Sequence, residues 1–129
     1  MTYYGYSNKS TQFNDWIQYF CRHGSLLVTD LDFIFYDDVL KRMKIVEVKT
    51  FRAKIKDWQL KIYKTLDFAL KNMTQFDETG NFEYEGFFII TMDTDTPETA
   101  KRIDINSVQV TKEQLVDFLD FKIRFEELR

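Results

Sequence analysis

The segment KIVEVKTF, residues 44–51, has the composition of a buried β-strand but carries two opposite charges. Branched and aromatic residues dominate it, which is typical of strands. Glu47 and Lys49 interrupt the apolar run, and such side chains are rarely buried without a partner. Because side chains alternate along a strand, Glu47 and Lys49 share one face, whereas Val46 and Val48 share the other. The pattern therefore predicts a charged pair on one face of a buried strand.

The preceding segment SLLVTDLDFIFYDD, residues 25–38, predicts a second strand that ends at an acidic turn. A short connection between two neighbouring strands favours an antiparallel hairpin. Asp30 and Asp32 share one face of this strand by the same alternation. If that face aligns with the charged face of the next strand, the carboxylates of Asp30, Asp32 and Glu47 converge beside the Lys49 amine.

A group of carboxylates repels itself unless a cation joins it, and Mg²⁺ prefers hard oxygen ligands of this kind. A metal held there activates water, orients a phosphate and neutralises charge on a leaving oxygen. Lys49, at the edge of the group, is placed to orient the attacking water or to stabilise the transition state. These residue types favour hydrolysis of phosphodiester bonds, with Mg²⁺ as cofactor and Mn²⁺ as a substitute.

The rest of the chain predicts an α/β sandwich with a mixed central sheet, a small C-terminal hairpin and a terminal helix. The uninterrupted apolar run Phe87–Ile90 favours a strand covered on both faces. Thr111 and Gln114 form the pattern of a capping box at the start of the last helix. Apolar periodicity predicts helices at residues 11–23, 55–73 and 111–125, and further strands at 84–93 and 102–110.

Length and composition narrow the class of protein. A chain of 129 residues with 44% hydrophobic residues is long enough for one core, so we expect a single domain over residues 1–129. One cysteine and one histidine exclude a zinc site and Cys-His catalysis. No apolar run reaches the length of a membrane span, and the first residues are unlike a signal peptide. We therefore expect a cytoplasmic protein without a membrane partner.

Charge is unevenly distributed along the chain. Residues 41–71 contain ten Lys or Arg and three acids, a local charge of +7, so that the remainder carries −10. This asymmetry indicates a face for a polyanion such as nucleic acid, or alternatively the solvated side of an amphipathic helix. Arg52, Lys54 and Lys56, which follow the Glu-x-Lys strand, are the residues expected to contact the substrate.

Asp32 followed by Glu47-Val48-Lys49 on the next strand resembles the PD-(D/E)xK nuclease superfamily. That group includes restriction enzymes, Holliday-junction resolvases and RecB-like nucleases. The resemblance implies a restriction-endonuclease-like α/β/α sandwich. It also implies that Asp32, Glu47 and the Val48 carbonyl bind the metal while Lys49 assists catalysis. Asp30 is a further candidate ligand.

A second part of the resemblance lies in the helix that follows. Gln59 and Tyr63 are one turn apart on one helix face, and the spacing resembles the QxxxY signature of RecB-like members. There these side chains support the metal site or the substrate phosphate. The matching stretches also look like small proteins of phages and archaeal viruses, which would place this protein in a host cytoplasm. The resemblance covers roughly residues 11–93.

Two features of the chain qualify the resemblance. Many relatives have a Glu in the first helix that completes the metal site, whereas residues 11–23 contain Asp15 as their only acid. Asp120-Phe121-Lys122 also matches (D/E)xK, but it lies on a predicted helix, where i and i+2 point apart. The sequence thus predicts a metal-dependent nuclease acting on DNA. The alternative is an inactive module of the same fold that binds nucleic acid or protein, and a homodimer through the aromatic terminal helix stays open.

Overall fold

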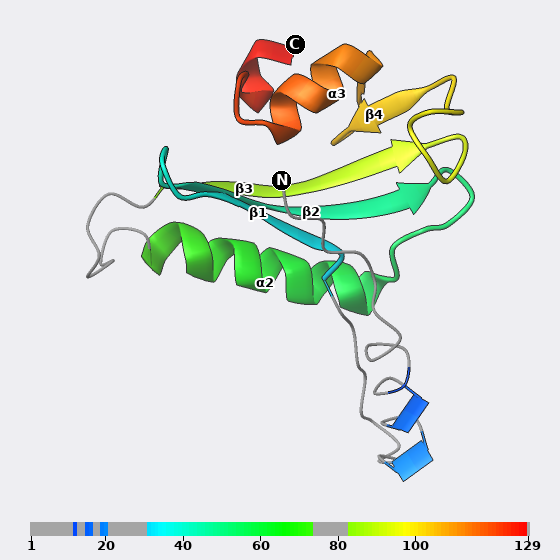
Figure 1. Ribbon diagram of the computed structural model, residues 1–129. Coiled ribbons are helices and arrows are strands. Elements are labelled where there is room, and N and C mark those ends of the chain that lie inside the picture. The colour runs from blue at the N-terminus through cyan, green and yellow to red at the C-terminus, as the bar shows by residue number, and fades with distance from the viewer. Residues whose placement is uncertain (1–11, 13–14, 17–18, 21–30, 74–82, 129) are drawn as a thin grey trace.

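The computed structural model describes residues 12, 15–16, 19–20, 31–73 and 83–128 (Figure 1). Within them the chain forms an α/β fold with one mixed sheet. The strands are β1 (Phe33–Asp37), β2 (Arg42–Thr50), β3 (Glu83–Met92), β4 (Ile103–Ile105) and β5 (Val108–Val110). The helices are α2 (Asp57–Met73), α3 (Lys112–Leu119) and the 3-10 turn η2 (Phe125–Leu128).

The strands lie in the order β1-β2-β3-β4-β5. β1 and β2 form the predicted antiparallel hairpin, and α2 then carries the chain to β3, which is parallel to β2. β4 and β5 continue the sheet as a second small hairpin. The predicted mixed sheet is therefore confirmed, with the Glu-x-Lys strand β2 inside it.

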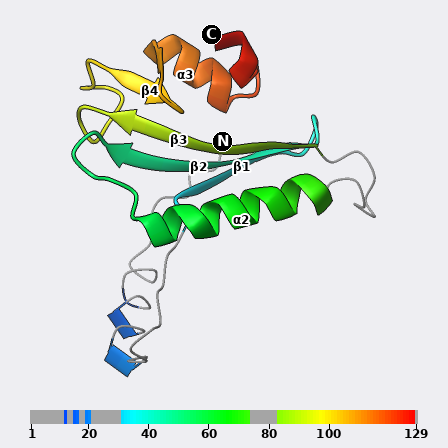
Figure 2. The same ribbon diagram turned by 180° about the vertical axis from the view of Figure 1, so that it is seen from behind.

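Helices cover both faces of the sheet. Figures 1 and 2 show α2 along one face and α3 with η2 over the other. The main core lies on the α3 side, where Val46 and Ile90 pack with Leu115 and Phe118. On the α2 side the ring of Tyr63 lies 4.9 Å from that of Phe87. The two faces of β2 therefore meet different helices.

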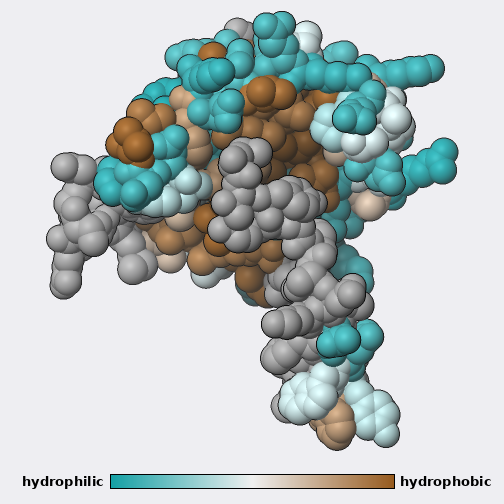
Figure 3. Space-filling model, viewed as in Figure 1, coloured by the Kyte–Doolittle hydropathy of each residue, from teal (hydrophilic) through white to brown (hydrophobic). Residues whose placement is uncertain are grey.

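The face of the sheet that α3 covers is apolar, and part of it lies open between α3 and β1. Figure 3 shows hydrophobic residues gathered between α3 and the strands. A hollow of about 270 Å³ opens there, with Phe33, Phe35, Val48 and Leu119 among its lining residues. This apolar side is distinct from the charged side of β2 that carries Glu47 and Lys49.

The terminal helix is shorter than the sequence predicts. The capping box of Thr111 and Gln114 is present, but α3 ends at Leu119. Phe121 takes φ +63°, and the N–H groups of Phe121 and Lys122 donate to the carbonyls of Phe118 and Asp117 at 3.2 and 2.8 Å. This is a Schellman ending, which glycine usually occupies. The sequence gives no such signal because a phenylalanine stands at the left-handed position.

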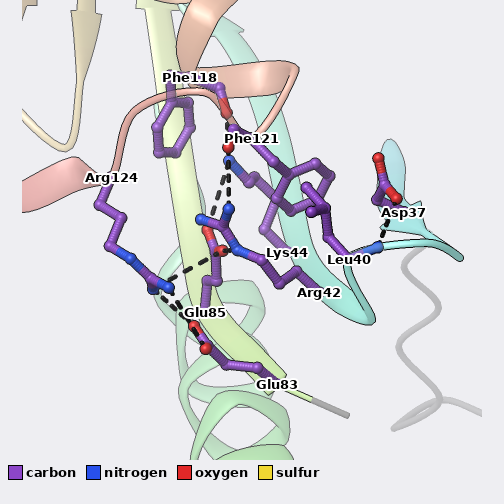
Figure 4. A network of polar contacts seen from close by, with 9 residues as sticks. All are labelled: Asp37, Leu40, Arg42, Lys44, Glu83, Glu85, Phe118, Phe121 and Arg124. Atoms are coloured by element: carbon purple, nitrogen blue, oxygen red, sulfur yellow. Dashed lines mark hydrogen bonds and ion pairs between the residues drawn. The ribbon is translucent and has the colours of Figure 1, made fainter. Parts of the chain in front are cut away.

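A buried ionic network fastens this C-terminal segment to the sheet (Figure 4). Lys44 is fully buried; its ammonium donates to the Phe118 carbonyl and lies 3.6 Å from a Glu85 oxygen. Arg42 donates to Glu85 and, at 2.9 Å, to the Phe121 carbonyl. The Lys44 ammonium also lies 3.7 Å from the centre of the Phe118 ring, within cation–π range. The network gives β2 and β3 a polar attachment to the segment after α3.

The aromatic side chains of the C-terminal segment pack largely within the chain. Phe118 and Phe121 are buried, and the Phe125 ring packs 5.6 Å from that of Phe88. Homodimerisation through this segment stays a prediction.

Parts of the predicted N-terminal elements lie outside the described residues. Of the helix predicted over residues 11–23, the described residues 12, 15–16 and 19–20 are helical. Of the strand predicted over residues 25–38, the described part forms β1 from Phe33 to Asp37, and Asp30 is outside the description. None of the described helices has the length and apolar character needed to cross a membrane.

Candidate functional site

The β1–β2 turn places Asp32 beside Glu47. The Asp37 carboxylate accepts the N–H groups of Val39 and Leu40, each at 2.9 Å, and Lys41 closes the turn at φ +55°. Pairing then runs regularly from Asp37 opposite Arg42 to Phe33 opposite Val46. One step further along this register brings Asp32, the residue before β1, opposite Glu47. A slip of one residue would turn the acidic side chain to the other face.

Direct hydrogen bonds confirm the juxtaposition. The Asp32 carboxylate accepts the backbone N–H of Val48 at 2.9 Å, and the Asp32 N–H points to a Glu47 carboxylate oxygen at 3.4 Å. The Lys49 ammonium lies 3.5 Å from the other Glu47 oxygen. Two acids and one amine from two strand segments therefore meet, as the sequence predicts.

Charge in this group is not balanced. The Glu47 side chain is only 4% exposed, and that of Lys49 is 25% exposed. Burial, followed by repulsion from the Asp32 carboxylate, raises the pKa of Glu47 above its ordinary value, and Lys49 offsets only part of this effect. Among the described residues, two carboxylates thus lie beside one ammonium, an excess of negative charge that a cation would neutralise.

The predicted metal ligands are only partly brought together. Asp32 and Glu47 meet, and the Val48 N–H points towards Asp32. Asp15 is exposed, and within the described residues no three His, Cys, Asp or Glu side chains gather as a metal-binding group. Asp30 lies outside the described residues. The described site thus offers two carboxylates.

Gln59 and Tyr63 lie on α2, which covers the Glu47 face of the sheet. The Gln59 side chain accepts the backbone N–H of Lys56 at 3.2 Å and so caps the start of α2. Tyr63 is 1% exposed and packs on Phe87; Phe87 is two residues before Ile89, the register partner of Glu47. Both predicted residues therefore belong to the helix under the site, where they position α2.

The predicted substrate-binding residues follow β2 directly. Arg52, Lys54 and Lys56 are all exposed on the connection to α2. Lys54 and Lys49 line a hollow of about 280 Å³ there. This hollow could not be predicted from the sequence, because Phe51, Leu60 and Ile89 look like ordinary core residues until the register of the strands is known.

The basic surface is smaller than the charge count implies. Of the ten basic residues in 41–71, Lys44 is buried and Arg42 is half-buried, and both pair with Glu85 on the α3 side. Lys49 is held by Glu47. The seven exposed members are Lys41, Arg52, Lys54, Lys56, Lys61, Lys64 and Lys71. Six of these seven lie on α2 or on the connection before it.

Comparison with known proteins does not identify relatives. The chain matches no protein-family model, no curated protein and no solved structure.

Proposed function

We propose that the protein is a metal-dependent nuclease of the PD-(D/E)xK type that hydrolyses phosphodiester bonds in DNA. The observation that carries the proposal is the meeting of Asp32, Glu47 and Lys49 on one face of the sheet. A restriction-endonuclease-like sandwich is part of the proposal. It is supported by the helical layers on both sides of the sheet and by the order β1, β2, α2, β3.

The residues fit Mg²⁺ or Mn²⁺. Mg²⁺ is commonly held by one or two carboxylates while it keeps several waters, and Asp32 and Glu47 supply two. A residue in an antiparallel pair directs its N–H and C=O towards the same neighbour, so the Val48 carbonyl accompanies the N–H that bonds Asp32. Glu47, which is buried, and Asp32, which is half-buried, repel each other and so favour a hard divalent cation.

Each side chain then has a role in hydrolysis. A bound metal would act as a Lewis acid and lower the pKa of a coordinated water. The Lys49 ammonium, held 3.5 Å from Glu47, orients the attacking water and balances charge that develops on the phosphate. Arg52, Lys54 and Lys56 are exposed beside it and hold the neighbouring phosphates.

The test is metal-dependent cleavage of supercoiled plasmid, single strands and branched junctions, with Mg²⁺, with Mn²⁺ and with chelator. The variants Glu47→Ala and Lys49→Ala are expected to lose activity. The chain supplies a matched control: Asp120 and Lys122 repeat the motif and form an exposed ion pair of 3.9 Å. The double variant Asp120→Asn, Lys122→Met is expected to cut like the native protein. Cutting that survives both Glu47→Ala and Lys49→Ala contradicts the proposal.

A binding module with the same fold is the alternative. It is favoured by one observation, the presence of two rather than three acidic groups at the described site. Salt-sensitive binding of DNA without cleavage under any metal condition would support this alternative.

A further inference from the structure

An open hollow lies beside Lys49, at the ends of β2 and β3 and next to the start of α2. Figure 1 shows the β2–α2 connection at this end of the sheet. The volume of the hollow, about 280 Å³, is just below the range of small-ligand pockets, which begins near about 300 Å³. Phe51, Ile55, Leu60 and Ile89 are among its lining residues.

Apolar walls and cationic ends are combined in this hollow. Ile55, Leu60 and Ile89 supply aliphatic surface, and among the described residues the charged lining side chains are Lys49 and Lys54. None of the described carboxylates lines the hollow. A ligand with an apolar ring and a phosphate satisfies both parts, because the ring leaves water and the phosphate meets the amines.

Phe51 is an exposed aromatic residue whose backbone is hydrogen-bonded to β3. Its N–H donates to the Met92 carbonyl at 2.9 Å, which ties its backbone to β3. The Arg102 guanidinium lies 5.6 Å from the centre of the ring, and Arg102 pairs with Asp104 at 3.1 Å. The ring nevertheless remains 43% exposed. An exposed aromatic ring that is fixed in place loses little conformational entropy when a base stacks on it.

Lys49 joins the hollow to the acidic pair. It lines the hollow and lies 3.5 Å from a Glu47 oxygen. The hollow and the acidic pair therefore share Lys49 as a common neighbour.

We propose that the Phe51 hollow, defined by Phe51, Ile55, Leu60 and Ile89 with Lys49 and Lys54 at its ends, binds the base next to the scissile phosphate. This inference rests on the proposed nuclease function and specifies its substrate. A base inside a duplex is paired and stacked and cannot enter such a hollow. The preferred substrate is therefore a nucleic acid with an unpaired base at the cleavage point: a single strand, a flap or a junction.

The test measures binding in chelator by fluorescence anisotropy, which separates recognition from cleavage. The probes are a labelled single-stranded DNA, the same strand with abasic positions, and its duplex. The native protein is expected to prefer the intact single strand. Phe51→Ala is expected to weaken that binding on the order of tenfold to a hundredfold, the range of one stacked base, with duplex binding unchanged.

Three further variants test whether the preference for the single strand depends on the hollow. Phe51→Trp is expected to keep the preference, and Leu60→Trp, which fills the hollow, is expected to remove it. Phe68→Ala is the matched control, because Phe68 is a 72% exposed aromatic residue on α2 that does not line the hollow. Circular dichroism reports whether each variant is folded.

The outcomes separate the two proposals. Metal-dependent cleavage with no effect of Phe51→Ala or Leu60→Trp on substrate preference overturns the base site and leaves the nuclease intact. Phe51-dependent binding of single strands without cleavage overturns the nuclease and leaves the base site. Equal binding of intact and abasic strands overturns the base site directly, and absence of any nucleic-acid binding overturns both.

Discussion

The Asp32 carboxylate accepts the Val48 N–H at 2.9 Å, so the acid before β1 is bonded to the middle of the Glu-x-Lys motif. This bond gives Asp32 two functions that substitutions can separate. The carboxylate oxygen closes the end of the β1–β2 hairpin, and in the mechanism that we propose its charge, with that of Glu47, would hold the metal ion. An amide keeps the first function and removes the second.

We therefore expect Asp32→Asn to fold with native stability and to lose at least about a hundredfold in metal-dependent activity. Asp32→Ala should lose the activity and also destabilise the fold by about 1 kcal/mol, because the Val48 N–H loses its acceptor. Urea unfolding in chelator, combined with calorimetric titration of Mn²⁺, measures both effects. Equal stability of the two variants would show that the hydrogen bond to Val48 contributes nothing.

The two buried glutamates of the sheet should respond with opposite sign to loss of charge. Glu47 is repelled by Asp32 and only partly balanced by Lys49. Glu85 is 6% exposed and contacts both Arg42 and Lys44. In chelator, Glu47→Gln is expected to stabilise the protein by roughly 1 kcal/mol, as at other sites shaped for function. Glu85→Gln is expected to destabilise it by on the order of 3 kcal/mol.

Thermal unfolding in chelator and in excess Mn²⁺ measures this contrast. The native protein and Glu85→Gln should both gain stability from the ion, since binding to the folded state raises the free energy of unfolding. Glu47→Gln should gain none. A lower melting temperature of Glu47→Gln in chelator would argue against electrostatic repulsion at the acidic pair.

Alternation within β2 was enough to predict which residues share a face. Val46 lies in the core with Phe118, whereas Lys49 and Ile89 line the opposite side. The meeting of Asp32 with Glu47 depends on more than alternation, because the turn sets the register. That turn relies on the Asp37 side chain, which is a turn signal in the sequence, and on Lys41 at φ +55°, which is not, so the register could not be predicted.

Contacts between residues far apart in the sequence could not be predicted. Lys44 looks like one more surface charge in a basic segment, yet it is buried against Glu85 and the Phe118 ring. Phe121 looks like a helical core residue, yet it ends the helix in the left-handed region. The Phe118 carbonyl that accepts from Lys44 is 74 residues away in sequence, and the Phe121 carbonyl accepts from Arg42 at a separation of 79 residues, so no local pattern reveals either contact.

The β4–β5 turn offers a simple test of backbone strain. Asn106 and Ser107 both have positive φ, +45° and +69°, as a two-residue hairpin turn requires, and glycine is the preferred second residue. Ser107→Gly is expected to raise the free energy of unfolding by about 0.5 kcal/mol, because relief of strain exceeds the added entropy of the unfolded chain. Ser107→Ala, the control, should bring no gain in urea unfolding. Equal effects of the two substitutions would contradict a contribution from the positive φ.

Lys44 should make stability depend on pH in the alkaline range. Burial lowers the pKa of Lys44 to about 8 from its ordinary value of 10.5, although Glu85 opposes the shift; Arg42 and Arg124 are the other charges that act on it. Between these two pKa values the unfolded chain binds more protons than the folded protein, so the free energy of unfolding rises with pH. Below pH 8 the ammonium is charged in both the folded and the unfolded state, so its contribution to the free energy of unfolding no longer changes with pH.

From pH 7.5 to 9.5 this group is expected to add roughly 2 kcal/mol to the free energy of unfolding. The range stops below the titration of Tyr84, whose pKa is raised by burial and by Asp67 and whose contribution has the opposite sign. Lys44→Met keeps an apolar chain against the aromatic rings and leaves Glu85 paired with Arg42. Urea unfolding of the native protein and of Lys44→Met at several pH values isolates the contribution of Lys44. The difference between their free energies of unfolding removes the titration of the groups that the two proteins share. Parallel curves would show that Lys44 titrates as an ordinary surface lysine and is not buried with its charge.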